Sequence, residues 1–94
     1  MKRKITITRK RNFIGYVVDM TIIIDHKPFN IIKSGEFIEF YVDEDHHFLE
    51  ISVPRSSAQR GSLEIPPGTE DVSYIVSVKA GILKNQIVIS QNKD

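Results

Sequence analysis

Hydrophobic and polar residues alternate along much of the chain, with the period of two that places one face of a β-strand against a core. In 4–9, Ile5 and Ile7 alternate with threonines, and Val72 to Ala80 follows the same pattern. No window combines helical spacing of apolar residues with capping residues. Strands are predicted at 4–9, 16–25, 29–32, 36–42, 46–53, 63–65, 72–80 and 83–89. The sequence therefore predicts an all-β protein of seven or eight strands.

These strands predict a single-domain antiparallel β-sandwich over residues 1–94, with a small β-barrel as the alternative. The sandwich is favoured because Ile23, Phe37 and Phe48 make several strands apolar on both faces. The segment 16–25 contains three consecutive isoleucines, which indicates a central strand. The polar segment 55–61 is predicted to be an exposed loop, and 90–94 a frayed tail.

The densest apolar segment, Met20 to Val53, is interpreted as two successive hairpins. Asp25 to Pro28 has the composition of a tight turn, and Asp43 to Asp45 is predicted to form the next one. In the strand that returns from the second turn, Leu49 and Ile51 share a face, with Phe48 opposite. His47 belongs to the face of Leu49, and His46 to that of Phe48.

This segment carries three motifs of one family. Ile24-Asp25-His26 ends a strand, Ser34-Gly35-Glu36 precedes the next, and Asp45-His46-His47 precedes the last. In this order the segment 21–53 resembles the PEGA-type family of small bacterial β-sandwich domains, although His26 and Asp45 replace turn glycines of that pattern. The resemblance implies a β-sandwich and an accessory or binding module, often extracytoplasmic, without enzyme activity.

Charge is strongly segregated although the net charge is only +1. From Ser34 to Glu50 there is no lysine or arginine, while the first eleven residues carry six cations: Lys2, Arg3, Lys4, Arg9, Lys10 and Arg11. This basic strand could contact the phosphates of nucleic acid or an anionic lipid surface. The alternative is that its lysines and arginines protect an edge strand from pairing with another chain.

The acidic and histidine-containing turn Asp43 to His47 offers carboxylates and imidazoles, which are ligands for divalent metals. Adjacent residues of a strand point to opposite faces, so His46 and His47 do not readily share one ion. Ser34, Ser56 and Ser57 lie in no nucleophile elbow. A solvated turn is the favoured interpretation, and no catalytic residue, metal site or cofactor is predicted.

Aromatic residues give the remaining candidate. Phe37, Tyr41 and Phe48 form an exposed surface for a partner if 36–42 pairs with 46–53, or else fill a second packed layer. The predicted function is a non-catalytic module for protein interaction or self-association. Binding of nucleic acid or an anionic surface through the basic strand is the alternative.

Compartment is only weakly constrained. The chain has no cysteine, and its basic start is followed by no apolar run of the kind found in signal peptides or transmembrane helices. We expect a cytoplasmic protein, or an extracytoplasmic one if a signal peptide precedes this sequence.

Overall fold

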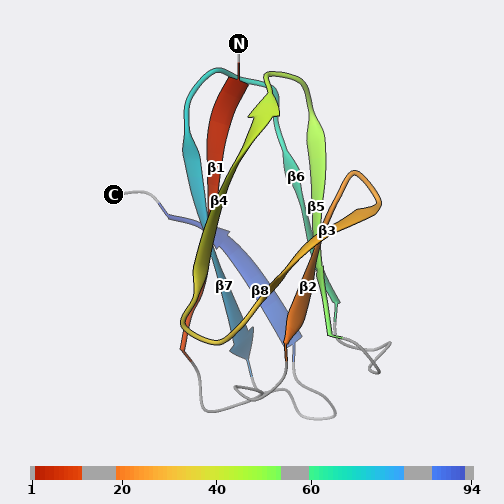
Figure 1. Cartoon of the computed structure of the whole chain (residues 1–94), viewed down its shortest axis with the longest axis vertical. Helices are drawn as coiled ribbons and strands as arrows, with labels where there is room; N and C mark the ends of the chain where they lie inside the picture. Colours follow the sequence, from red (N-terminus) through yellow and green to blue (C-terminus); the bar gives the residue numbers. More distant parts are fainter. Residues whose placement is uncertain (1, 12–18, 54–59, 80–85, 93–94) are drawn as a thin grey trace.

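The computed structural model describes residues 2–11, 19–53, 60–79 and 86–92, which form eight strands and no helix (Figure 1). The strands are β1 (Lys2–Arg9), β2 (Met20–Ile24), β3 (Lys27–Ile32), β4 (Phe37–Asp43), β5 (His47–Ser52), β6 (Arg60–Ile65), β7 (Val72–Lys79) and β8 (Gln86–Gln91). Within this part of the chain, no helix is therefore available that could span a membrane.

The strands build two packed four-stranded sheets, which confirms the predicted β-sandwich. Sheet A has the order β4-β1-β7-β8, and sheet B has the order β3-β2-β5-β6. All neighbouring strands are antiparallel except β1 and β7, which run parallel. β2 lies between β3 and β5, so the three consecutive isoleucines do mark a central strand.

Only the first of the two predicted hairpins forms. β2 and β3 pair across the turn at Asp25 and His26, both of which have positive φ. β4 pairs with β1 in sheet A, whereas β5 pairs with β2 and β6 in sheet B. The chain thus crosses between the sheets after β4, at the upper end of the sandwich in Figure 1. Alternation defines the buried face of a strand but not the strand that it pairs with. The prediction that 36–42 and 46–53 form a second hairpin was wrong for this reason.

Several element boundaries differ from the prediction, and Lys27 and Pro28, predicted as part of a turn, belong to β3. Arg60 and Gly61 belong to β6 rather than to a loop, and Ser90 and Gln91 belong to β8 rather than to a frayed tail. Strand β2 begins at Met20, and the predicted strand residues 16–18 lie outside the described residues. Pairing with a neighbouring strand satisfies the backbone of these polar segments, which their composition alone does not reveal.

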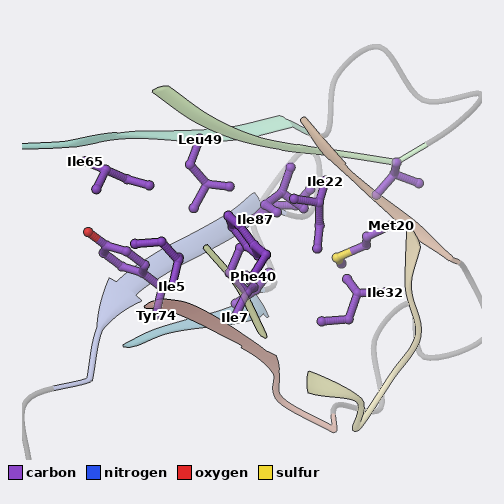
Figure 2. Packing of buried hydrophobic residues seen from close by; sticks show 13 residues of the cluster. Ile5, Ile7, Met20, Ile22, Ile32, Phe40, Leu49, Ile65, Tyr74 and Ile87 are labelled. Carbon is purple, nitrogen blue, oxygen red and sulfur yellow. The ribbon is translucent and has the colours of Figure 1, made fainter. Parts of the chain in front are cut away.

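The core fills the space between the sheets (Figure 2). Among the described residues, thirteen hydrophobic side chains are buried: Ile5, Ile7, Met20, Ile22, Ile32, Phe40, Leu49, Ile51, Val53, Ile65, Tyr74, Val76 and Ile87. The shared face predicted for Leu49 and Ile51 of β5 is confirmed by the burial of both residues, and the alternation predicted for β7 by the burial of Tyr74 and Val76.

The two sides of the sandwich differ. On one side β6 and β8 lie against each other, and a Cβ atom added to Gly61 would be 2.9 Å from Cγ2 of Ile87. On the other side β3 and β4 are the last strands of their sheets. There the rings of Phe29 and Phe40 pack together with centroids 4.7 Å apart. The candidate surface lies on this second side.

Candidate interaction surface

Strand β4 is an edge strand with an apolar outer face. Its inward residues include the buried Phe40, and alternation directs Phe37, Glu39 and Tyr41 outward. Phe37 is 63% exposed and Tyr41 64%. Two large aromatic side chains on one strand are thus left open to solvent.

Among the described residues, no strand pairs with β4 on the side away from β1, so its backbone has an unpaired edge there. The Arg9 N–H donates to the Glu36 carbonyl at 2.8 Å, so this register position is bonded between β1 and β4. Bonded positions recur every second residue in an antiparallel ladder. The intervening residues Phe37, Glu39 and Tyr41 consequently direct their N–H and C=O groups away from β1. On β1 the same alternation directs the Lys4 N–H toward Asp71 Oδ1, which it meets at 2.9 Å.

The other three edge strands are protected, as exposed edges of soluble proteins usually are. β3 carries Lys27 and Pro28, and a register irregularity interrupts its pairing with β2 between Ile22 and Ile23. β6 and β8 lie against each other. β4 has seven residues without lysine, arginine or proline, and so lacks these protective features.

Neighbouring side chains of β1 complete the outer face. Lys4 lies opposite Tyr41, Thr6 opposite Glu39, and Thr8 opposite Phe37. Lys4 Nζ forms an ion pair with Glu39 Oε2 at 3.2 Å, and the hydrogen bond and charge of Glu39 raise the pKa of Lys4. We call the outward side chains of β4, namely Phe37, Glu39 and Tyr41, together with its free backbone edge, the β4 surface.

The three predicted aromatic residues do not lie on one surface. Phe37 and Tyr41 lie together on the outer face of sheet A, but Phe48 is on β5 and faces outward from sheet B. Its ring packs against His26 with centroids 5.5 Å apart. A single surface made by all three rings is therefore wrong, because the pairing of β4 with β5 on which it depended does not occur.

Two exposed hydrophobic residues of β3 were not identified from the sequence. Phe29 and Ile31 lie on β3 and are 49% and 53% exposed. The neighbouring Pro28 is the sequence signal for an edge strand, because proline cannot donate to a ladder. Phe29 contacts Phe40, an inward residue of β4, so the ring contact joins the two sheets on this side of the sandwich.

The six predicted cations do not form one patch. Arg3 and Arg9 alternate inward with Ile5 and Ile7, and both are buried. Arg3 donates to the carbonyls of Glu70 at 2.7 Å and Pro66 at 2.8 Å. Arg9 donates to the Ile32 carbonyl at 3.0 Å, and burial lowers its pKa although the charges of Asp19 and Glu36 oppose this. These two guanidinium groups form hydrogen bonds inside the protein, so their assignment as phosphate contacts is wrong.

The other cations of the N-terminal segment remain near the surface. Lys2, Lys10 and Arg11 are exposed, and Lys4 is half-buried in its pair with Glu39. Because β1 lies between β4 and β7, the alternative interpretation of β1 as a protected edge strand is also wrong.

His47 of the acidic and histidine-containing turn bonds to the carboxylates of Asp25 and Asp43 and so links three elements. We call these three side chains the staple. His47 Nδ1 lies 2.6 Å from Asp25 Oδ2, and His47 Nε2 lies 2.8 Å from Asp43 Oδ1. Burial by itself lowers the pKa of His47, but the hydrogen bonds and charges of both carboxylates outweigh it, so the pKa is raised. An imidazolium donating from both nitrogens fits this geometry, because each ring nitrogen faces a carboxylate oxygen.

His46 does not join this staple. Its Nε2 atom lies 3.9 Å from Glu64 Oε1, so the two adjacent histidines have different partners, as predicted. Among the described residues, no group of three or more histidines, cysteines, aspartates or glutamates is arranged to hold a metal ion. The two hydrogen bonds of His47 link the β2–β3 turn to the end of β4.

Comparison with known proteins identifies a similar fold but no family. No family model matches the chain, and no curated protein matches it. The chain is similar to a solved NMR structure of a protein from Eubacterium rectale, with a TM-score of 0.57 and 11% identity. The match covers 98% of this chain and 91% of that one. At this identity the likeness concerns the fold alone, and the resemblance to PEGA-type domains stays a prediction.

Proposed function

We propose that this protein is a non-catalytic interaction module that binds an extended segment of a protein partner along the free edge of β4. The observation that carries the proposal is the exposure of Phe37 and Tyr41 on an edge strand without protective residues. Main-chain hydrogen bonds would supply affinity, and the two rings would supply contact area for alternate side chains of the added strand.

Geometry on the β4 surface supports this mode of binding. Phe37 and Tyr41 project on the same side as each other, and Glu39 lies between them along the strand. The three backbone positions that point to the free edge are the ones whose side chains face outward. An added strand would thus place every second side chain against the aromatic face while it bonds to the backbone of β4.

The contacts of the N-terminal cations give less support to the alternative of an anionic ligand. Arg3 and Arg9 use guanidinium donors on carbonyls inside the protein, and Lys4 is engaged by Glu39. The cations of the N-terminal segment that stay exposed are Lys2, Lys10 and Arg11. A phosphate contact built on them would weaken as salt rises, which separates it from strand pairing.

Selection from a displayed library of random peptides tests the proposal. We expect peptides enriched on the wild-type protein to lose binding to Glu39→Pro, because proline removes one of the free N–H groups of β4. Ile31→Ser is the control for a change at an exposed residue away from β4, since Ile31 lies on the outer face of sheet B. Circular dichroism confirms that both variants are folded.

Two results would contradict the proposal. One is that no peptide is enriched on the wild-type protein. The other is that the enriched peptides bind equally well to the wild type and to folded Glu39→Pro, since their site would then lie elsewhere.

A further inference from the structure

The β4 surface is acidic as well as aromatic. No lysine or arginine occurs between Ser34 and Glu50, and Glu39 and Asp43 both lie on β4. The ion pair of Glu39 is made with Lys4, on the β1 side of the strand. Its side chain is still 46% exposed, so the carboxylate remains accessible to a second charged group.

Strand β1 pairs with β4, so its side chains indicate which residues suit a strand beside β4. It runs antiparallel to β4 and presents Lys4, Thr6 and Thr8 on the outer face, opposite Tyr41, Glu39 and Phe37 respectively. Lysine beside a tyrosine ring and a carboxylate gains from both the ring face and the charge. Threonine is β-branched and suits a pleated, half-exposed position. A strand added on the opposite side of β4 would meet the same three side chains.

We infer that the β4 surface selects an extended segment in which basic residues alternate with β-branched residues, the basic ones beside Glu39 and Tyr41. This inference rests on the proposed function and names the chemistry of the partner. A second copy of this chain fits less well, because two β4 strands meeting edge to edge would bring the acidic Glu39 and Asp43 of each copy together.

Three synthetic peptides of nine residues provide the probes. In the first, lysine and isoleucine share one face and threonine fills the other. The second replaces the lysines by glutamate, and the third replaces them by glutamine. Binding is followed by fluorescence anisotropy at low ionic strength, and the site is located from NMR shifts of the Phe37, Glu39 and Tyr41 amides.

We expect the wild-type protein to bind the lysine peptide about five- to tenfold more tightly than the glutamate peptide, because the favourable pair with Glu39 becomes a repulsive one and the contact of lysine with the Tyr41 ring is lost. Glu39→Lys is expected to reverse this preference. Glu64→Lys is the matched control, since Glu64 is an exposed glutamate on β6, an edge strand of sheet B. It is expected to leave the preference unchanged. If Glu39→Lys does not fold, Glu39→Gln serves instead and is expected to reduce the preference.

Equal or tighter binding of the glutamate peptide would overturn the inference, as would a preference that Glu39→Lys or Glu39→Gln leaves unchanged. In either case, shifts of the β4 amides with any probe would leave the proposed function standing. If no probe shifts these amides, the inference is wrong. The library selection then decides the proposed function independently.

Discussion

His47 joins three elements through its two ring nitrogens. Its partners Asp25 and Asp43 belong to the β2–β3 turn and to the end of β4, and Asp25 also accepts a bond from the Phe48 N–H at 2.8 Å. The pKa of Asp25 is lowered because its bonds to His47 and Phe48 outweigh the effect of burial. That of Asp43 is lowered by its bonds to the Asp45 N–H and to His47.

The signs of these shifts define a pH window. The pKa of His47 is raised above 6.5, so its contribution to stability is complete below that pH and is lost as pH rises through the folded value. The aspartate pKa values are lowered below 3.8, so their contribution is present above that pH and is lost as pH falls through the folded values. The staple is therefore strongest between pH 3.8 and 6.5.

We predict that His47→Gln lowers the free energy of unfolding by about 1–2 kcal/mol near pH 5, because charge-assisted hydrogen bonds are lost. The difference from the wild type should narrow near pH 9 and near pH 2. Urea unfolding followed by circular dichroism at these three pH values measures it. A difference that is constant across pH would contradict a charged staple, and His46→Gln is the control.

Arg3 gives a second prediction at the residue scale. Arg3→Ala should lower the free energy of unfolding by about 1–3 kcal/mol, because the carbonyls of Pro66 and Glu70 lose their donor. Lys2→Ala, which changes an exposed neighbour, should stay within about 0.5 kcal/mol of the wild type. Thermal or urea unfolding tests the pair, and equal effects would show that Arg3 is not a structural residue.

At the scale of the element, the sequence pattern predicted which face of a strand is buried, but it did not predict which strands pair. The inward residues of β1 and β7 followed from alternation alone, since side chains of a strand point to opposite sides. That β1 is central and β4 is an edge did not follow, because both strands alternate in the same way. Their positions depend on a parallel contact between β1 and β7, which are far apart in the chain.

Proline substitutions test the orientation of β4 directly. Ile38→Pro should lower the free energy of unfolding by about 2–4 kcal/mol, because its N–H is directed to β1 and its side chain packs against the core. Glu39→Pro should cost about 1 kcal/mol or less, because its N–H points to the free edge. Thermal unfolding compares the two variants. A larger cost for Glu39→Pro would mean that the ladder has the opposite alternation.

The whole molecule is a sandwich with one closed side and one open side. β6 and β8 close the first side, where Gly61 admits the close approach of Ile87. Edge strands β3 and β4 border the second side, and four of the five exposed large hydrophobic residues among those described lie on these strands: Phe29, Ile31, Phe37 and Tyr41. Association through this side would depend on the charges of β4.

We predict that any edge-to-edge association of the wild-type protein strengthens as salt rises, because screening reduces repulsion between two acidic β4 strands. Glu39→Gln should associate at lower salt than the wild type does. Light scattering across protein concentrations, at low and high ionic strength, measures this. Self-association that weakens with salt would indicate an electrostatic contact elsewhere, such as one made by the basic N-terminal strand.

The sequence by itself determined the all-β class, the sandwich, and the buried face of most strands. These are local properties, because the two-residue period of a strand and the conformational limits of its turn residues act within a few positions. Only the tertiary structure decided that β4 crosses to β1, that Phe48 lies on the face opposite Phe37 and Tyr41, and that Arg3 and Arg9 bond inside the protein. These outcomes depend on contacts between distant segments, whose energies no local alternation encodes.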